Sequence, residues 1–138
     1  MNTFRVLAVL AATAVALPAF AEGDAAKGEK TFKKCKACHM IVNGDEVIVK
    51  GGKTGPDLYG VIGRQAGSFE GFKYSKSLVA LGATGFVWDE ASLAEWVANP
   101  KDFLKAHDQA PKTKMSFKLK KGGEDVAAYL ASVGPKAE

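Results

Sequence analysis

The sequence predicts a small, single-domain, all-α protein in which short helices alternate with long loops. Its 138 residues suit one domain. Apolar residues recur at helical spacing in several segments, and six glycines fall between residues 40 and 64, which is typical of loops and turns. The run Val47-Ile48-Val49 suits a short strand, but a single strand makes no sheet, and we expect none.

Five helices are expected after the first 22 residues. Three of them follow a residue that commonly caps helix starts, and a fourth begins with a proline at its first position. The five helices run from Asp24 to about Lys34, from Ser75 through Leu81, from Asp89 to Asn99, from Pro100 through Phe103 and Leu104, and, after Gly122-Gly123, over the apolar stripe Val126, Tyr129, Leu130 and Val133.

Residues 1–21 have the pattern of a secretory signal peptide. Arg5 precedes an apolar run over residues 6–17, and Ala19-Phe20-Ala21 fits the small-x-small cleavage pattern. We therefore expect cleavage after Ala21 and a soluble, exported domain over residues 22–138. The run is too short to cross a bilayer comfortably, and an uncleaved N-terminal anchor is the alternative.

The segment Cys35-Lys36-Ala37-Cys38-His39 has the C-x-x-C-H spacing of a c-type haem attachment site. Each thiol can bind one vinyl group of the porphyrin, and the adjacent imidazole can bind the iron. A redox dithiol or half of a zinc site would share part of this pattern. A dithiol lacks its βαβ context here, and a zinc ion would need two more ligands from a chain whose only other histidine is His107.

A second iron ligand is predicted by elimination. Met40 directly follows His39 and cannot reach the opposite face of a porphyrin, whereas Met115 lies far along the chain between loop residues. His107, in a polar stretch that suggests an exposed loop, is the rival ligand. A thioether paired with an imidazole raises the reduction potential and fills the last coordination position, which favours electron transfer over catalysis.

The chain carries 19 lysines and arginines against 15 acidic residues, a net charge of +4. Lysines gather at two places in the sequence, around the C-x-x-C-H motif and around Met115. Aromatic residues do not interleave with them, so nucleic-acid binding is not expected. The lysines near the C-x-x-C-H motif are Lys27, Lys30, Lys33, Lys34 and Lys36, and those near Met115 are Lys112, Lys114, Lys118, Lys120 and Lys121.

Further motifs surround these residues, and their order and combination are more specific than C-x-x-C-H alone. Over residues 23–134 the chain resembles class I c-type cytochromes, most closely the bacterial cytochrome c2 group. The shared motifs are residues 28–39, Lys53-Thr54-Gly55-Pro56-Asp57-Leu58-Tyr59-Gly60, Gly63-Arg64, Gly71-Phe72-Lys73-Tyr74, the Trp88 segment, Asn99-Pro100, residues 113–117 and the helix from Val126 to Leu130.

The resemblance implies a class I cytochrome c fold, with helices and long loops wrapped around one haem c bound through Cys35 and Cys38. It implies that the Pro56 carbonyl accepts from His39, and that Gly28 and Phe32 pack against Tyr129 and Leu130. The residues that it implies as partners of the haem propionates are Arg64, Tyr74, Trp88 and Thr113. For Tyr74 and Trp88, ordinary core packing is the alternative. Trp96 departs from the family, which commonly has tyrosine there.

The same resemblance implies a monomeric periplasmic electron carrier rather than an enzyme, active in photosynthesis or respiration. Its donor would be a cytochrome bc1 complex, and its acceptor a photosynthetic reaction centre or a terminal oxidase. Transient docking would use a lysine ring. That ring comprises Lys34, Lys36, Lys53, Lys112 and Lys114. An open-site haem enzyme or sensor, and an electron-entry subunit of a larger enzyme, are the alternatives.

Overall fold

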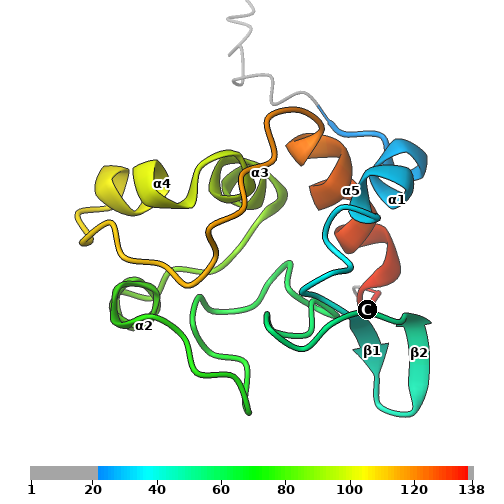
Figure 1. Cartoon of the computed structure of the whole chain (residues 1–138), viewed down its shortest axis with the longest axis horizontal. Helices are drawn as coiled ribbons and strands as arrows, with labels where there is room; N and C mark the ends of the chain where they lie inside the picture. Colours follow the sequence, from blue (N-terminus) through cyan, green and yellow to red (C-terminus); the bar gives the residue numbers. More distant parts are fainter. Residues whose placement is uncertain (1–21, 137–138) are drawn as a thin grey trace, which may run out of the picture.

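The computed structural model describes residues 22–136 as five helices and one two-stranded hairpin around a central cavity (Figure 1). The signal peptide expected over residues 1–21 lies outside the described residues. In chain order the elements are α1 (Ala25–Phe32), β1 (Ile41–Asn43), β2 (Glu46–Val49), α2 (Lys76–Ala83), α3 (Glu90–Ala98), α4 (Pro100–Ala106) and α5 (Gly123–Val133).

Membrane-spanning helices were sought in the described range. Between residues 22 and 136, every helix is too short or too polar for a bilayer crossing.

The three helix starts predicted from the capping residues Asp24, Ser75 and Asp89 are confirmed, and the start predicted at Pro100 also has a cap, Asn99. In each case a side-chain oxygen accepts a hydrogen bond from the backbone N–H three residues later, which satisfies one of the free donors of the first turn. The caps are Asp24 on Lys27 (3.1 Å), Ser75 on Leu78 (3.3 Å), Asp89 on Ser92 (2.7 Å) and Asn99 on Asp102 (3.2 Å). α1 ends at Phe32, slightly before the predicted Lys34, and α2 extends past Leu81 to Ala83.

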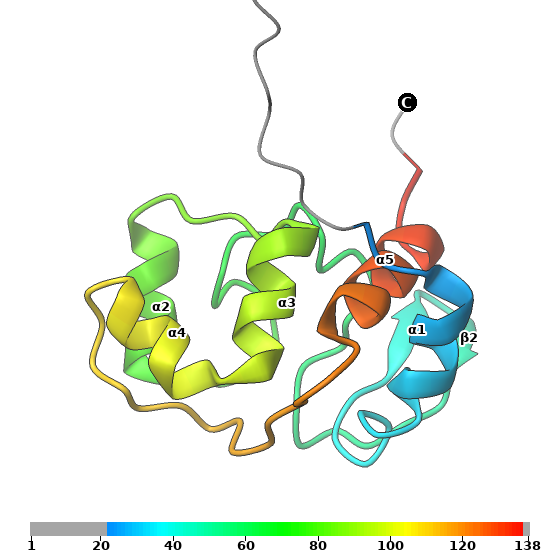
Figure 2. The same cartoon turned by 90° about the horizontal axis from the view of Figure 1, so that it is seen from above.

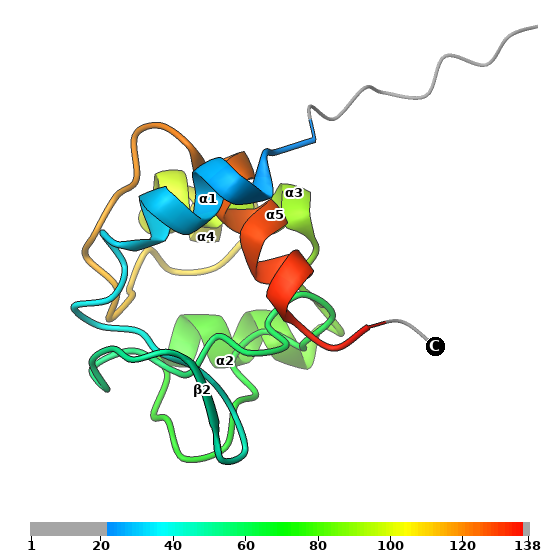
Figure 3. The ribbon, with the colours of Figure 1, turned by 90° about the vertical axis from the view of Figure 1, so that its right-hand side faces the viewer.

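The first and last helices pack across each other, as Figure 3 shows. Gly28 makes this crossing possible, because a Cβ there would lie 1.9 Å from the Asp125 carbonyl oxygen. One turn later, the Phe32 ring lies 5.7 Å from that of Tyr129. The packing that the family resemblance implied for Gly28 and Phe32 is therefore present.

A cluster of aromatic rings joins α3, α4 and the segment that precedes them. Trp88 stacks on Phe103 with ring centroids 5.5 Å apart, and Trp96 lies 5.6 Å from Trp88 and 5.7 Å from Phe103. All three side chains are buried, and such contacts add to the stability that comes from area burial. The cluster forms a rigid support behind one wall of the cavity.

The expectation of no sheet is wrong, because β1 and β2 form an antiparallel hairpin. Asn43 pairs with Glu46 across a two-residue turn, and Gly44 at its first position has φ of 59°, which a glycine adopts without strain. The missing partner of the Val47-Ile48-Val49 run is the three-residue strand that begins just after His39. The all-α class still describes the fold, since the hairpin is the only sheet among residues 22–136.

α1, α5 and the hairpin lie on one side of the molecule, and α2 and α4 lie on the other (Figures 1 and 2). Residues of α1 and α5 and residues of α2 and α3 line the same cavity. The segment between α4 and α5, orange in Figure 2, runs along one edge of the molecule and connects the two sides. This segment carries Met115.

Candidate haem site

All nine site residues predicted from the sequence line the same cavity, which has a volume of about 350 Å³. Its walls are mainly apolar, and they come from segments far apart in the chain. The nine residues are Cys35, Cys38, His39, Pro56, Arg64, Tyr74, Trp88, Thr113 and Met115. The cavity is of the size that small-molecule and cofactor sites have.

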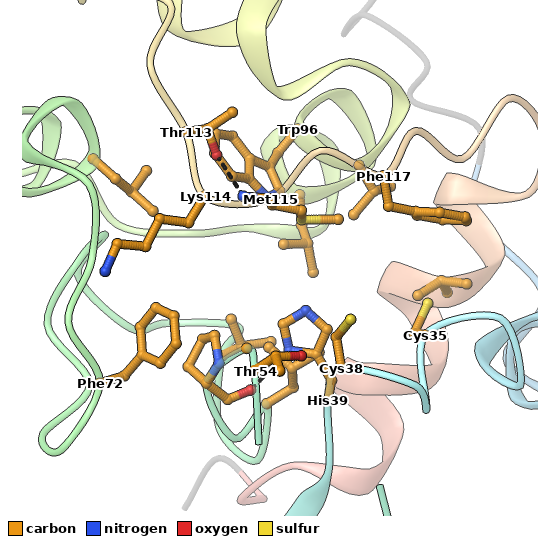
Figure 4. A pocket seen from close by; sticks show the side chains of 18 of the residues that line it. Cys35, Cys38, His39, Thr54, Phe72, Trp96, Thr113, Lys114, Met115 and Phe117 are labelled. Atoms are coloured by element: carbon orange, nitrogen blue, oxygen red, sulfur yellow. Dashed lines mark hydrogen bonds between the residues drawn. The ribbon is translucent and has the colours of Figure 1, made fainter. Parts of the chain in front are cut away.

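The C-x-x-C-H motif folds into a single helical turn at one end of the cavity. The Cys35 carbonyl accepts hydrogen bonds from the N–H groups of Cys38 (3.2 Å) and His39 (2.9 Å). Both thiols and the imidazole therefore belong to one wall of the cavity (Figure 4).

Cys35 and Cys38 form no disulfide with each other, and Cys35 is half-buried whereas Cys38 is exposed. Burial raises the pKa of Cys35 to about 11, Cys38 adds to the rise and Lys34 opposes it. A reactive redox dithiol depends on a lowered cysteine pKa, so this environment disfavours that alternative. The zinc alternative also lacks support, because no three His, Cys, Asp or Glu side chains cluster within the described range.

A hydrogen bond to the backbone holds the His39 imidazole in place. Its Nδ1 lies 2.8 Å from the Pro56 carbonyl oxygen, and because a carbonyl can only accept, Nδ1 carries the proton and Nε2 is left as a free donor atom for a metal. Burial lowers the pKa of His39, and the bond to Pro56 partly opposes that shift. The ring is therefore neutral at pH 7, the form that binds metals.

Gly55 lets the imidazole lie flat against the chain. A Cβ at this position would be 2.4 Å from His39 Cε1 and 2.7 Å from Nδ1. Such distances are far inside van der Waals contact, so any other residue would displace the ring.

Met115 points into the cavity from the wall opposite His39 (Figure 4). Its backbone N–H donates to Thr113 Oγ1 at 3.1 Å, which fixes the short turn that presents the thioether. The neighbouring Lys114 ammonium donates to the Lys73 carbonyl and lies 5.7 Å from the Phe72 ring. These contacts connect the Met115 segment to the loop before α2.

His107, the rival ligand, lies away from the cavity. It ends α4, and its ring packs 4.3 Å from Phe103 and 5.1 Å from Phe86. The expectation of an exposed loop there is wrong, because the aromatic cluster half-buries the ring. It is not among the residues that form the cavity wall.

The wall of the cavity includes a half-buried guanidinium, that of Arg64. Arg64 donates from Nη1 to the Asp57 carbonyl (2.9 Å) and from Nη2 to the Tyr59 carbonyl (2.5 Å). Burial lowers the pKa of Arg64, and neither of the two ion pairs found in residues 22–136 involves it. Tyr74 and the Asp57 carboxyl lie near the guanidinium and partly offset the lowering of its pKa, but its geometric hydrogen bonds go to neutral carbonyls. A partly buried cation bonded in this way favours a further nearby anion, such as a carboxylate of a bound group.

Tyr74 and Trp88 lie beside Arg64. Burial raises the pKa of Tyr74, whose hydroxyl oxygen accepts from the Phe69 N–H at 3.3 Å. Trp88 is 5% exposed, and its backbone N–H donates to the Arg64 carbonyl at 2.9 Å. Trp88 belongs both to the aromatic core and to the cavity wall. Core packing and contact with a bound group therefore do not exclude each other at this residue.

A helical, loop-rich fold around one apolar cavity, with a C-x-x-C-H turn in its wall, defines a class I c-type cytochrome. The cytochrome c2 of Rhodobacter capsulatus is 61% identical over 129 residues, covering 91% of this chain and 93% of that protein. The cytochrome c-551 of Roseobacter denitrificans is 57% identical over 133 residues, covering 94% and 95%. The chain belongs to the cytochrome c2 family.

Solved structures agree with this assignment. The cytochrome c2 structure from Rhodobacter capsulatus has a TM-score of 0.77 at 62% identity, covering 80% of this chain and 98% of that one. The cytochrome c2 from Paracoccus denitrificans has a TM-score of 0.79 at 51% identity, covering 84% and 100%. No protein-family model matches the chain.

Membership of this family establishes the cofactor and the general role. The chain carries one haem c, attached covalently through Cys35 and Cys38, and is an electron carrier rather than an enzyme. The residues of the cavity fit this group: two thiols at one end, a neutral imidazole with Nε2 free, apolar walls and the guanidinium of Arg64.

The sequence did not single out three cavity residues that the structure does. Gly55 lies against the His39 ring, and Phe72 and Phe117 line the cavity from loops. Phe117 is 43% exposed, and its position two residues after Met115 was the available signal. Trp96 also lines the cavity and is 6% exposed.

Proposed function

We propose that this chain is a periplasmic, monomeric carrier of single electrons in which His39 and Met115 are the two axial ligands of the haem iron. The observation that carries this proposal is that the two side chains point into one cavity from opposite walls. When bound, the haem supplies an iron that alternates between ferrous and ferric states.

The protein's own residues explain why such a site would carry electrons. The imidazole is fixed by Pro56 and Gly55, and the thioether is fixed through Thr113, so the ligands need to move little when charge arrives or leaves. Two protein ligands leave no open position for a substrate. Apolar walls disfavour the more highly charged ferric state and, together with the thioether, support a high reduction potential.

The remaining polar residues of the cavity would hold the carboxylates of the porphyrin. Arg64 offers a half-buried positive charge, and Tyr74, Trp88 and Thr113 surround the same cavity with hydroxyl and indole donors. Each of these donors would offset part of the cost of burying a carboxylate.

We further propose that electrons arrive from a cytochrome bc1 complex and leave to a photosynthetic reaction centre or a terminal oxidase. The five lysines of the predicted ring, at positions 34, 36, 53, 112 and 114, are exposed. Lys34 and Lys114 also line the cavity, so positive charge borders the haem site. Such charge attracts acidic partner surfaces and allows fast dissociation. The periplasmic location follows from the signal-peptide pattern.

Replacement of Met115 by alanine tests the ligand assignment. The ferrous wild-type holoprotein should not bind carbon monoxide, whereas Met115→Ala should bind it and should lose the methionine-to-iron charge-transfer band of the ferric form. Met40→Ala is the matched control, since it removes the other thioether of the mature domain and should leave both spectra unchanged. Tight carbon monoxide binding by the native wild type would contradict the proposal, as would a charge-transfer band that persists in Met115→Ala.

A further inference from the structure

The backbone that holds His39 consists of two segments lying side by side, residues 38–42 and residues 55–58. The Gly55 N–H donates to the Cys38 carbonyl at 2.8 Å, and the Leu58 N–H donates to the Met40 carbonyl at 3.0 Å. Pro56, whose carbonyl accepts from His39, lies between these two links. The position of that carbonyl therefore depends on how firmly the segments are joined.

A third link between the segments uses a side chain. Asp57 Oδ1 accepts from the Val42 N–H at 3.0 Å and from the Tyr59 N–H at 2.9 Å. The register of the hairpin shifts between Ile41 and Val42, so the Val42 N–H is turned toward Asp57 rather than β2. One carboxylate oxygen thus joins the strand that follows His39 to the residue that follows Pro56.

We propose that Asp57 is a positioning residue for the haem-ligating imidazole, because its carboxylate oxygen holds the Pro56 carbonyl against His39 Nδ1. The contacts form a closed circuit: His39 to Val42 along the chain, Val42 to Asp57 by hydrogen bond, Asp57 to Pro56 along the chain, and Pro56 back to His39 by hydrogen bond. Apart from the imidazole itself, the Asp57 oxygen is the one link of this circuit that a side-chain substitution can remove.

The position of the oxygen, rather than the negative charge, is what the circuit requires. Both donors to Oδ1 are neutral backbone N–H groups, which an amide oxygen can satisfy equally. The negative charge of Asp57 acts separately, on the Arg64 guanidinium, where burial lowers the pKa and Asp57 partly opposes that shift. The hydrogen bond from His39 Nδ1 determines the orientation of the ring and the basicity of its other nitrogen. A loosened Pro56 carbonyl should therefore appear first as faster exchange of the His39 Nδ1 proton with solvent.

Three variants of the ferrous holoprotein separate position from charge. Asp57→Asn keeps the oxygen and loses the charge, Asp57→Glu keeps the charge and moves the oxygen by one methylene, and Asp57→Ala removes both. Hydrogen exchange of the His39 Nδ1 proton, followed by NMR, should accelerate about tenfold in the Glu and Ala variants, the effect of losing roughly one net hydrogen bond. It should stay within about twofold of wild type in Asp57→Asn.

Two references keep this measurement specific. The amide of Leu130, buried in α5, should exchange at the wild-type rate in every variant, which separates local loosening from general destabilisation. Asp45→Asn, at the exposed turn of the same hairpin, is the matched charge control and should leave the His39 proton unchanged. If Asp57→Ala yields no holoprotein, Asp57→Glu and Asp57→Asn suffice for the comparison.

The inference fails if the Asn variant accelerates exchange as much as the Glu variant, or if the Glu variant exchanges at the wild-type rate. The inference about Asp57 rests on the proposed function only in taking His39 as the iron ligand. The inference and the proposed function can fail separately. Loss of Met115 ligation changes the charge-transfer band, whereas the Asp57 variants should retain that band while the His39 proton exchanges faster.

Discussion

At the scale of single residues, Gly55 shows how the absence of a side chain determines what the cavity wall can hold. The imidazole of His39 occupies the volume where a Cβ of residue 55 would lie. The backbone and the ring therefore approach more closely than any residue with a side chain permits. This close approach can be tested by adding a single methyl group at residue 55.

Gly55→Ala should displace the His39 ring and weaken its bond to the iron. Resolving a 2.4 Å contact requires either backbone movement or ring movement, and overpacking of this kind costs about 1–3 kcal/mol. The expected result is a lower midpoint of thermal unfolding for the holoprotein, with a partly high-spin absorption spectrum. Lys53→Ala, an exposed change two residues away, is the control. Wild-type stability and spectrum in Gly55→Ala would contradict this account.

The site residues that the sequence predicted share one property, which is that local spacing encodes their geometry. Cys35, Cys38 and His39 fall on one helical turn, so their sequence spacing fixes their arrangement. The link between Asp57 and Val42 joins residues 15 apart across an irregular strand, and no local pattern encodes it. The contact of Gly55 with the His39 ring is equally non-local, so it could be found only in the fold.

At the scale of elements, the helices were predictable because capping is local. A side-chain oxygen and the N–H three residues later lie within one turn, and that relation is visible in the sequence at Asp24, Ser75 and Asp89. The start of α4 was predicted from Pro100, and the structure adds the Asn99 cap. The hairpin was missed because β1 has only three residues, one of which, Ile41, is fully buried. Gly44 and Asp45 at its turn gave the one local signal.

The cap of α3 makes a prediction about acid. Hydrogen bonds from Ser92 lower the pKa of Asp89 below its usual 3.8. A carboxyl whose pKa is lower in the folded than in the unfolded state stabilises the fold at pH values above its unfolded pKa. This stabilisation is lost as the pH falls through the folded pKa. Asp89→Ala should therefore cost about 1 kcal/mol at pH 7 and progressively less below about pH 3.8.

Urea unfolding of the holoprotein at several pH values measures this effect. Asp89→Asn is the matched control, because an asparagine caps equally well and does not titrate. The asparagine variant should thus keep its stability near neutral pH and gain relative to wild type in acid. A constant difference between wild type and Asp89→Ala at all pH values would contradict the assignment.

At the scale of the whole molecule, charge is unevenly distributed relative to the cavity. The chain has a net charge of +4, and Lys34 and Lys114 border the cavity. Oxidation of the ferrous holoprotein by ferricyanide, an anion, should therefore slow about tenfold as ionic strength rises from roughly 10 to 200 mM, because salt screens the attraction. Oxidation by a cationic cobalt phenanthroline complex should accelerate over the same range.

Two variants with the same change in net charge locate the effect. Lys34→Gln alters a lysine at the cavity, and Lys105→Gln alters an exposed lysine on α4, outside the cavity wall. The first should reduce the salt dependence of the ferricyanide reaction more than the second, as measured by stopped flow. Equal effects would mean that net charge alone, and not the lysines at the haem site, steers the encounter.

The crossing of α1 and α5 has a consequence for how the molecule is made. α1 has eight residues, too few to persist as an isolated helix in water, and the partner that it packs against is the last element of the chain. On export from its N-terminus, as proposed above, Cys35 and Cys38 would leave the membrane before α5 does. The contact of α1 with α5 can form only after the last helix has emerged, so the porphyrin could reach the two sulfur atoms before this part of the fold is complete.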